Sequence, residues 1–517
     1  MRKTIEYPEV PFHVLLEQAA RQWPDTPAII FHDRSVTFGE WNRQTDRFAA
    51  GLHELGIQPG DRVALYTPNC PEFEIAFFGI TRAGAAPTPL NPSYKEREVR
   101  HQLADSGAAA IVIHESLLPI LLAVREQLPD LRSAIVVGTA APAGARTFAS
   151  FLEGQSNSPP KIAPAFDDLA ALPYSSGTTG ASKGVMLTQR NLVCNALQFV
   201  DATASTAGDT LLIFLPLYHI YGVSLMATAA ASGARQVLLD RFHLEEVVSL
   251  IARQQITELY VVPPVMLALA NAPGLRPEQF RSVRFIMSAA APLSSEVAKR
   301  VSERLEVPVI QAYGMTETSP LTHMVPVERS SELLGSVGVV AADTHCRIVD
   351  IETGERELPV GEVGEVVVRG PQVMAGYWNA PEETAQTLRH GWIHTGDIGR
   401  VDAEGALSIV DRKKEMIKYK AFSIAPAELE SILLEHPEIV DSGVTGQPDD
   451  EAGEVPKAYV VLRAGSQLSG DTIMQFVADR VAGYKQIRVV EIVDEIPRTP
   501  SGKILRRVLK ERASGTP

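Results

Sequence analysis

Apolar and polar residues alternate in two rhythms along the first 137 residues. Residues 14–23 have the apolar spacing of an amphipathic helix, which Pro24 and Asp25 end. Continuous apolar runs predict strands at residues 28–31, 63–66, 111–114 and 134–137, and further helices are expected at residues 37–55, 71–83 and 117–128. Fully apolar strands that alternate with helices predict an α/β fold built on doubly wound sheets.

Three later stretches have a different pattern. Residues 138–165 are rich in Ala, Gly, Pro and Ser without a clear period, which predicts a surface connection. Residues 211–231 carry no charge and are long enough to span a bilayer. Pro216, His219 and Gly222 interrupt that run, so we expect a strand end, a loop and a buried helix instead. Beyond residue 338, short alternating strands between Gly and Pro turns predict a small β-barrel-like unit.

Residues 174–184 form a segment rich in glycine and hydroxyl side chains. It holds three glycines, four hydroxyl residues after Ser175, and one lysine. The N–H and O–H donors of such a loop can surround a polyphosphate. It is not a Walker A loop, because Ser182 precedes Lys183 instead of following it. A flexible Gly/Ser linker is the alternative, but apolar strand-like runs on both sides of the segment argue against it.

This loop resembles the phosphate-binding signature of the adenylate-forming superfamily, whose members activate carboxylates with ATP. The further motifs that the resemblance requires occur downstream in the expected order, and the likeness covers about residues 10–512. They lie at residues 216–222, 285–293, 309–318, 392–399, 411–430 and 497–506. The resemblance implies a large N-terminal domain, residues 1–412, and a small mobile α+β C-terminal domain, residues 413–517.

The resemblance also implies ATP, Mg²⁺ and coenzyme A as reactants. The Tyr313 ring can stack on adenine, the Thr316 hydroxyl can bind the α-phosphate, and the Glu317 carboxylate offers Mg²⁺ a hard oxygen ligand. An isolated Thr-Glu pair would be an ordinary helix cap. Residues carried over for nucleotide or coenzyme A binding are Ser175, Ser176, Gly177, Thr178, Thr179, Gly180, Lys183, Ala290, Ala291, Gln311, Tyr313, Gly314, Asp397, Arg412, Lys420 and Ala421, with Glu317 and Thr179 assigned to the metal.

Three residues near the C-terminus complete the expected machinery. Asp397 is expected to follow a strand and a glycine, and by resemblance it binds the ribose hydroxyls, although a simple turn aspartate is the alternative. The charge run at residues 411–418 is either a solvated face or, by resemblance, the linker whose Lys414 is the hinge. Lys503 follows a Pro/Gly-rich turn and can reach into a cleft as the catalytic cation. The catalytic set expected is therefore Lys503, Thr316, Glu317 and His219.

The acid is expected to bind beside His219. A lone histidine among apolar residues is often a satisfied core residue, but the resemblance makes it a gate of the acyl pocket. The pocket residues carried over are His219, Tyr221, Gly222, Ala289, Ala312 and Val337. No acidic residue lies between residues 211 and 239, so a cationic amine finds no counter-ion there, and an uncharged acyl tail is expected. Many relatives have glycine in place of Ala289 and of Ala421, so these methyl groups reshape the acyl pocket and the pantetheine tunnel.

Composition agrees with a folded enzyme. The 517 residues are 45% hydrophobic and 21% charged, and the net charge of −14 without a long basic run argues against a nucleic-acid partner. Three scattered cysteines have no metal-type spacing and fit a reducing compartment. The first residues lack the apolar core of a signal peptide, so a cytoplasmic protein, with a homodimer as one possible assembly, is expected.

The sequence thus predicts an AMP-forming ligase that adenylates a carboxylic acid and transfers the acyl group to coenzyme A. A medium- or long-chain fatty acid is the expected substrate, with an aryl acid of the 4-coumarate or benzoate type as the alternative. A carrier protein as acceptor and a luciferase-like oxygenase remain rivals. A nucleotide-binding protein without catalysis is disfavoured by Lys183, Glu317, Asp397, Arg412 and Lys503.

Overall fold

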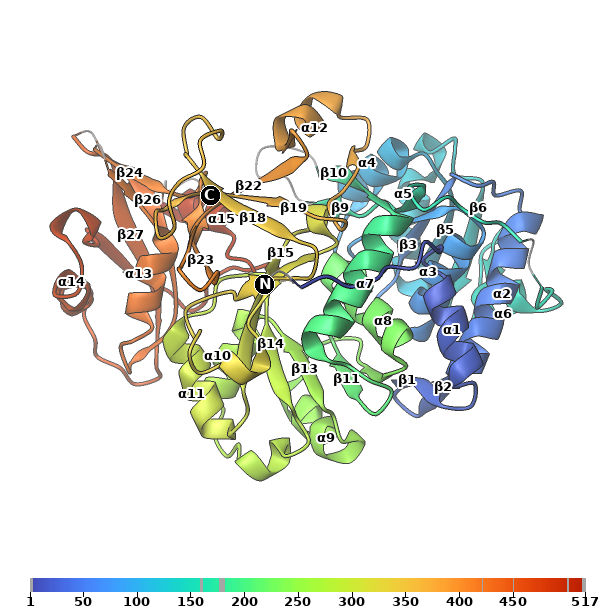
Figure 1. The fold of residues 1–517 in the computed structure, drawn as a ribbon, viewed down its shortest axis with the longest axis horizontal. Helices are drawn as coiled ribbons and strands as arrows, with labels where there is room; N and C mark the ends of the chain where they lie inside the picture. Colours follow the sequence, from blue (N-terminus) through green and yellow to red (C-terminus); the bar gives the residue numbers. More distant parts are fainter. Residues whose placement is uncertain are drawn as a thin grey trace.

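The largest sheet runs through the middle of the chain. The computed structural model describes residues 3–158, 161–175, 182–420, 422–449, 451–499 and 502–513. Nine strands pair in the order β17-β16-β15-β14-β13-β11-β12-β1-β2, as Figure 1 shows in part. They are β1 (Pro27–Phe31), β2 (Arg34–Thr37), β11 (Thr210–Ile213), β12 (Arg235–Leu238), β13 (Glu258–Val261), β14 (Phe285–Ser288), β15 (Val309–Gly314), β16 (Leu321–Met324) and β17 (Val339–Val340). The six strands from β1 to β15 pair in parallel and the edges in antiparallel fashion.

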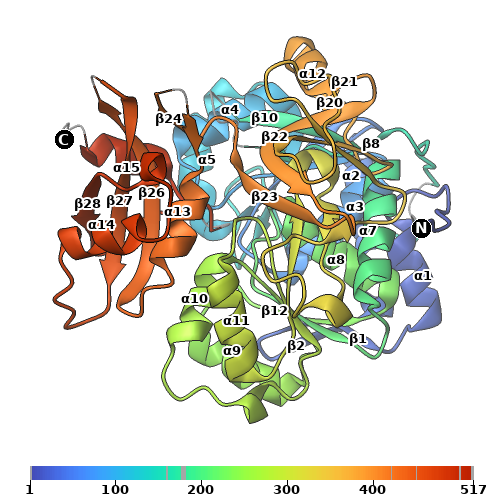
Figure 2. The same cartoon turned by 60° about the vertical axis from the view of Figure 1, so that its left-hand side comes forward.

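Helices cover both faces of this sheet. They are α7 (Gln189–Thr203), α8 (Ile220–Ser232), α9 (Leu244–Gln254), α10 (Pro263–Asn271) and α11 (Ser295–Leu305). Figures 1 and 2 place α7 and α8 on one side of the central strands and α9, α10 and α11 on the other. Parallel strands buried on both faces explain the continuous apolar runs, and the doubly wound prediction is confirmed.

A second parallel sheet lies toward the N-terminus, in the order β4-β3-β5-β6-β7. Its strands are β3 (Arg62–Tyr66), β4 (Ala86–Pro89), β5 (Ala108–His114), β6 (Ser133–Val137) and β7 (Arg146–Thr147). The helices of this half are α1 (Val14–Gln22), α2 (Phe38–Glu54), α3 (Pro71–Arg82), α4 (Glu96–Ser106), α5 (Leu118–Val124) and α6 (Phe148–Leu152). The Thr37 hydroxyl accepts a hydrogen bond from the Glu40 amide and caps α2 as expected.

The prediction that residues 138–165 form only a surface connection was wrong. They contain β7 and α6, and the rings of Phe148 and Phe151 each lie 5.3 Å from the ring of Phe48. A helix of five residues is too short to show a clear apolar period. The two phenylalanines at helical spacing were the signal that could have revealed it.

A small antiparallel sheet carries the phosphate loop. β8 (Leu169–Ala171), β9 (Tyr174–Ser175) and β20 (Gly376–Tyr377) all pair with β10 (Lys183–Thr188). Ser175 and Lys183 are opposite each other in the β9–β10 pair, so the ends of the loop are fixed by backbone hydrogen bonds.

Two five-stranded sheets complete the fold. The first corresponds to the expected β-rich unit and contains β18 (His345–Val349), β19 (Gly364–Arg369), β21 (Leu388–Arg389), β22 (Trp392–Val401) and β23 (Leu407–Arg412), with α12 (Pro381–Thr387) beside it. The second contains β24 (Ile417–Tyr419), β25 (Phe422–Ile424), β26 (Ile439–Asp449), β27 (Gly453–Leu462) and β28 (Val489–Ile492). α13 (Pro426–Leu433), α14 (Gly470–Ala478) and α15 (Arg506–Ala513) pack with this last sheet, which Figure 2 shows at one side of the molecule.

This last group, from β24 to α15, is called the C-terminal unit below. It has its own apolar core, in which Leu429 and Leu433 of α13 meet Ile473 and Val477 of α14. Residues 211–231 resolve into β11, a loop and the buried α8, as expected. No helix in the described part of the chain is long and apolar enough to cross a membrane.

Glu74 gives the fold a testable pH dependence. This residue of α3 is fully buried, and its Oε2 atom accepts one hydrogen bond, of 2.7 Å, from Gln236 Nε2. Burial raises the pKa of Glu74 to about 8, so the folded protein holds this carboxyl neutral at pH 7. Because the unfolded carboxyl ionises near pH 4.5, its contribution to stability is complete below that pH and is lost as the pH rises toward 8.

We expect Glu74→Gln to remove this loss, at roughly 1.4 kcal/mol for each pH unit between these two pKa values. Urea unfolding of both proteins between pH 5 and pH 8.5 measures the difference. Glu246→Gln, which changes an exposed carboxylate of α9, serves as the control and should leave the profile unchanged. Parallel profiles for the Glu74 variant and the wild type would contradict the assignment.

Candidate active site

The phosphate loop is anchored at both ends by α4. Tyr174 Oη donates to Asp105 Oδ2 at 2.5 Å, and His101 Nε2 lies 3.0 Å from the carbonyl oxygen of Ser182. The expected loop residues Ser176, Gly177, Thr178, Thr179 and Gly180 lie outside the described residues, as does Ala421 of the coenzyme A set. Ser175 and Lys183 are described, and each reaches a different neighbour.

Lys183 forms an ion pair with Glu383 of α12. Its Nζ atom lies 3.1 Å from Glu383 Oε1 and 5.7 Å from the centre of the Tyr377 ring. The lysine therefore projects toward the segment that follows β20, where a phosphate would compete with the exposed Glu383 carboxylate. A surface pair of this kind contributes little to stability, so its exchange for a phosphate costs little.

Two hydroxyl groups hold the Glu317 carboxylate. Glu317 lies in the short 3-10 turn Thr316–Thr318, and its Oε1 accepts from Ser175 Oγ at 3.1 Å and from Tyr377 Oη at 2.9 Å. The side chain is buried, with 6% of the residue exposed. Thr316 precedes it in the same turn, so the expected hydroxyl and carboxylate come together beside the loop.

This donor set fits Mg²⁺ and not a metal held by many side chains. Within the described ranges no group of three or more His, Cys, Asp or Glu side chains could hold a metal ion. Mg²⁺ is commonly bound by one or two carboxylates together with waters and phosphate oxygens. Glu317, a carboxylate fixed beside a phosphate loop, is suited to that role.

Asp397 is the centre of a second polar group. It accepts from Tyr313 Oη at 2.6 Å, and Arg412 Nε lies 3.2 Å from its Oδ1 atom. Asp397 and Arg412 are opposite each other in the β22–β23 pair. The expectation that Asp397 follows a strand was wrong, because it lies inside β22. Its amide instead donates to Thr395 Oγ1 at 3.1 Å, a contact that the sequence did not reveal.

Four other expected nucleotide residues lie in turns or make structural contacts. A side-chain carbon on Gly314 would lie 1.7 Å from the Pro320 carbonyl oxygen, so only glycine fits there. Gln311 donates through Nε2 to the Leu334 carbonyl at 3.0 Å. Ala290 has a φ of +72°, which sets the turn that follows β14, and Ala291 comes next in that turn.

A small cavity lies at the carboxyl ends of β11 and β13. Its lining residues are Leu215, Pro216, His219, Tyr221, Gly222, Val262 and Ala290. His219, Tyr221 and Gly222 are thus brought together as expected, whereas Ala289, Ala312 and Val337 do not line this cavity. Leu215 and Val262 were missed, although Val262 directly follows β13 and Leu215 lies two residues beyond β11. The volume of 10 Å³ holds about one water molecule, so this pocket must open to admit an acid.

His219 is a neutral imidazole in this wall. Its Nδ1 atom accepts from the Tyr221 amide at 3.2 Å, which leaves the proton on Nε2. Burial and, to a smaller extent, the nearby Lys503 cation together lower the pKa of His219 to about 4. The structure therefore favours a hydrogen-bond donor over a general base at this position.

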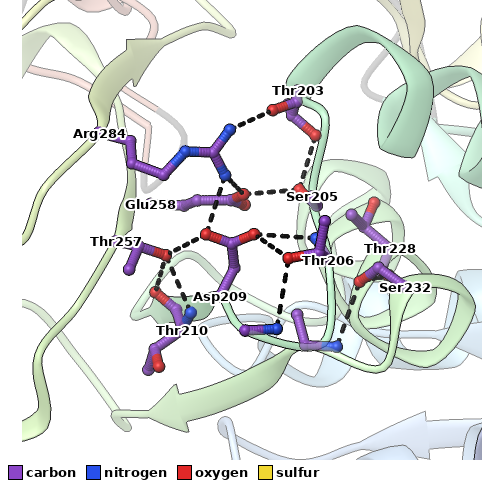
Figure 3. Close-up of polar contacts among 12 residues, drawn as sticks. Thr203, Ser205, Thr206, Asp209, Thr210, Thr228, Ser232, Thr257, Glu258 and Arg284 are labelled. Atoms are coloured by element: carbon purple, nitrogen blue, oxygen red, sulfur yellow. Dashed lines mark hydrogen bonds and ion pairs between the residues drawn. The ribbon is translucent and has the colours of Figure 1, made fainter.

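A buried polar network around Glu258, which is called the Glu258 network here, contacts the pocket through the rings of Tyr260 and Tyr221. Glu258 is fully buried and accepts from Ser205 Oγ at 2.7 Å and from Tyr260 Oη at 2.6 Å. Figure 3 shows Arg284 reaching both Glu258 and Asp209, at 3.2 Å and 2.8 Å. Burial raises the pKa of Glu258 to about 7. The Tyr260 ring in turn meets the ring of Tyr221 edge-on, with 6.4 Å between centres.

Lys503 reaches this site from the C-terminal unit. Gly502 has a φ of +83°, and a side-chain carbon there would lie 3.0 Å from Pro264 Cδ and 3.2 Å from Val262 Cβ. The Lys503 turn is therefore packed against the first turn of α10, beside the pocket. Burial lowers the pKa of Lys503 and Arg412 lowers it further, whereas Asp397, Glu317 and Glu415 raise it. The ammonium thus lies within electrostatic reach of both carboxylates described above.

Lys420 lies elsewhere. It occupies the turn between β24 and β25 with a φ of +52°, and its Nζ atom lies 5.8 Å from the Tyr419 ring. Its amide donates to the Ala452 carbonyl at 2.7 Å. These contacts stay within the C-terminal unit, whereas the Lys503 turn packs against Val262 and Pro264 outside that unit.

The fold and the site together define an adenylate-forming enzyme. Residues 16–378 match the AMP-binding enzyme family model, and residues 428–503 match the AMP-binding enzyme C-terminal domain. The chain belongs to the AMP-binding enzyme family. Within that family it is an AMP-forming acyl-CoA synthetase, as its relatives show.

Curated relatives include a 4-coumarate-CoA ligase of Pinus taeda, which is 40% identical over 97% of this chain and 95% of the relative. 4-Coumarate-CoA ligase 2 of Solanum tuberosum is 38% identical over 97% of this chain and 94% of the relative. Among solved structures, ATP-bound MatB from Rhodopseudomonas palustris matches with a TM-score of 0.90 and 30% identity over 97% and 99% of the chains. The anthranilate CoA ligase AuaEII in complex with anthranoyl-AMP matches with a TM-score of 0.91 and 27% sequence identity. The match covers 98% of this chain and 98% of that structure's chain.

The Glu258 network yields a prediction about acid binding. We expect Tyr260→Phe to remove one donor from a buried carboxylate and to lower the free energy of unfolding by about 1–3 kcal/mol. Because Tyr260 packs on Tyr221, the KM for the acid should rise while the KM for ATP stays unchanged. Steady-state kinetics with each substrate varied in turn measures this split.

Tyr66→Phe is the matched control. Tyr66 is a buried tyrosine of the second sheet whose Oη donates to the Tyr94 carbonyl at 2.8 Å, away from the Glu258 network. It should lose stability with no change in the KM for the acid. An acid KM that changes equally in both variants would show that Tyr260 acts only through general stability.

Proposed function

We propose that this enzyme adenylates a planar aryl acid of the hydroxycinnamate or benzoate class and transfers the acyl group to coenzyme A. The observation that carries the choice is the aromatic floor of the acid pocket. Tyr221 lines the pocket, Tyr260 packs behind it, and Phe199 and Phe285 surround Tyr260 at 6.0 Å and 5.8 Å between ring centres. A long alkyl tail would have to displace this cluster, whereas a flat ring needs only a narrow opening beside Ala290.

The Tyr221 hydroxyl supports a phenolic acid in particular. Its oxygen is buried and has no hydrogen-bond partner anywhere in the described ranges. A buried hydroxyl without a partner is costly, and a polar group on the substrate ring would satisfy it. The aryl alternative is therefore favoured over the fatty acid, in agreement with the 4-coumarate-CoA ligases among the relatives.

In the first half-reaction the carboxylate attacks the α-phosphorus of ATP and pyrophosphate leaves. Lys503, Thr316 and the loop donors stabilise the charge that develops on the phosphate oxygens. Tyr313, Asp397 and Arg412 hold the adenosine part. Mg²⁺, held by Glu317 and with Thr179 of the loop as a further ligand, supplies charge neutralisation when it is bound.

In the second half-reaction the thiol of coenzyme A displaces AMP from the acyl-adenylate. Residues 413–517 turn about Lys414 as one domain against residues 1–412, which withdraws Lys503 and brings the β24–β25 turn with Lys420 and Ala421 to the site. Support for this alternation comes from the chain itself. The Lys503 turn packs against Val262 and Pro264, whereas the contacts given above for Lys420 stay within its own unit.

Lys503→Ala separates the two half-reactions. We expect acid-dependent exchange between ATP and pyrophosphate to fall by roughly 10²-fold, because one charge-stabilising donor is lost. Thioester formation from a supplied acyl-adenylate and coenzyme A should remain close to the wild-type rate. Equal losses in both assays would contradict the alternation.

A pyrophosphate-release screen tests the substrate class. The panel pairs 4-coumarate with cinnamate, 4-hydroxybenzoate with benzoate, and includes saturated fatty acids of graded length. We expect release with the aryl acids, more with the hydroxylated member of each pair, and little with long alkyl acids. Preference for a long fatty acid would overturn the proposal. Release without thioester formation would favour a carrier-protein acceptor or an oxygenase.

A further inference from the structure

Asp411 joins the two sides of the Lys414 hinge. It lies in β23, opposite Ile398 of β22, and is buried with 5% of the residue exposed. Its Oδ1 atom accepts from the Arg412 amide at 2.6 Å, and its Oδ2 atom accepts from the Ala427 amide at 2.8 Å. Ala427 is the second residue of α13 in the C-terminal unit. The carboxylate is therefore anchored in one unit and bound to the other.

Asp411 supplies the cap that α13 lacks. The residue before this helix, Ala425, offers no side-chain cap, and Pro426 occupies the first helical position. The amides of a first helical turn need acceptors, and a carboxylate there also interacts favourably with the helix dipole. The start of α13 is thus satisfied by a residue that lies on the far side of the hinge.

The charges around Asp411 make the contact selective for one orientation. Arg506 of α15 pairs with Glu415 at 3.2 Å and with Glu430 at 2.8 Å, and its side chain is 14% exposed. Burial raises the pKa of Asp411, Arg506 lowers it, and Glu415 raises it again. The Arg506 guanidinium of the C-terminal unit therefore acts on three buried or half-buried carboxylates, and its effect on Asp411 requires α13 and α15 to face β23.

We propose that Asp411 is a positioning residue for the first half-reaction, because it holds the C-terminal unit in the orientation that places Lys503 in the site. This inference rests on the proposed function. The bond to Ala427 crosses Lys414, so a turn of the unit about that residue breaks it. A neutral contact in the same orientation joins Ser431 Oγ to Ser294 Oγ at 3.3 Å. Asp411 adds a charged and buried contact to it.

The test compares Asp411→Asn and Asp411→Ala in the two half-reactions. Asparagine keeps one acceptor without the charge, and alanine removes both acceptors. We expect acid-dependent ATP–pyrophosphate exchange to fall about tenfold in the alanine variant and by a smaller factor in the asparagine variant. Thioester formation from a supplied acyl-adenylate should be unchanged or faster, because that step needs the contact broken.

Asp402→Ala is the matched control. Asp402 lies in the turn between β22 and β23, and its Oδ1 atom accepts from the amides of Glu404 and Ala406, both at 2.9 Å. It is an aspartate with two backbone donors in the same sheet, but it makes these contacts within one side of the hinge. Both half-reactions should stay within twofold of the wild type in this variant.

A cross-link reports the orientation without any catalysis. Ser294→Cys combined with Ser431→Cys places two thiols where the hydroxyls meet, and we expect oxidation to join them in the otherwise unchanged protein. Adding Asp411→Ala should lower the yield of the cross-link several-fold, and adding Asp402→Ala should not. An unchanged yield, or equal loss of both half-reactions, would overturn the role of Asp411. Failure of wild-type exchange with every acid would overturn the proposed function instead, while the cross-link still decides the inference.

Discussion

The half-buried position of Lys503 is the constraint on which the rest of the site depends. Removing an ammonium ion from water costs several kcal/mol unless opposite charges compensate it. Here Asp397 and Glu317 provide that compensation, while Arg412 opposes it. The lysine is carried by a unit with its own core, so its place in the site depends on how that unit is docked. The charge balance around Lys503 and the orientation of the C-terminal unit therefore depend on each other.

The compensating carboxylates are themselves fixed by hydroxyl groups. Tyr377 and Ser175 donate to Glu317, and Tyr313 donates to Asp397. A carboxylate with its donors in place does not have to reorganise when a cation or a phosphate arrives, which is the condition for electrostatic catalysis. The Glu258 network has the same arrangement, because Tyr260 and Ser205 both donate to the buried Glu258 carboxyl group. Figure 3 shows the Ser205 contact.

Much of the fold was predictable from the sequence because it consists of buried parallel strands and amphipathic helices, both of which have a strong apolar pattern. The helix α6 was missed because it has only five residues. Asp397 was placed after a strand because the glycine before it suggested a turn, whereas β22 continues through it. The local sequence pattern does not predict a very short helix, and it does not predict how far a strand continues when pairing with neighbouring strands determines its length.

The site was predictable only as far as its motifs are local. The turn that holds Thr316 and Glu317 is such a motif, and a resemblance transfers it residue by residue. The partners that fix it are not local, since Tyr377 and Ser175 come from distant strands. No sequence pattern predicts the contact between Asp411 and Ala427, because the donor is an ordinary backbone amide. That amide needs an acceptor from elsewhere because Ala425 has no side chain that could cap α13.

Under the proposed reaction, these contacts would allow one orientation of the C-terminal unit to be stable and still be exchanged for another. With ATP bound, the negative charge of the phosphates adds to that of Glu317 and Asp397, and the attraction for Lys503 is at its greatest. Departure of pyrophosphate removes most of that charge, while Arg412 continues to repel the ammonium. The balance then depends on the remaining contacts across the hinge, of which the Asp411 cap on α13 is buried and charged. Under the proposed reaction, release of the first product is thus what allows the second half-reaction to begin.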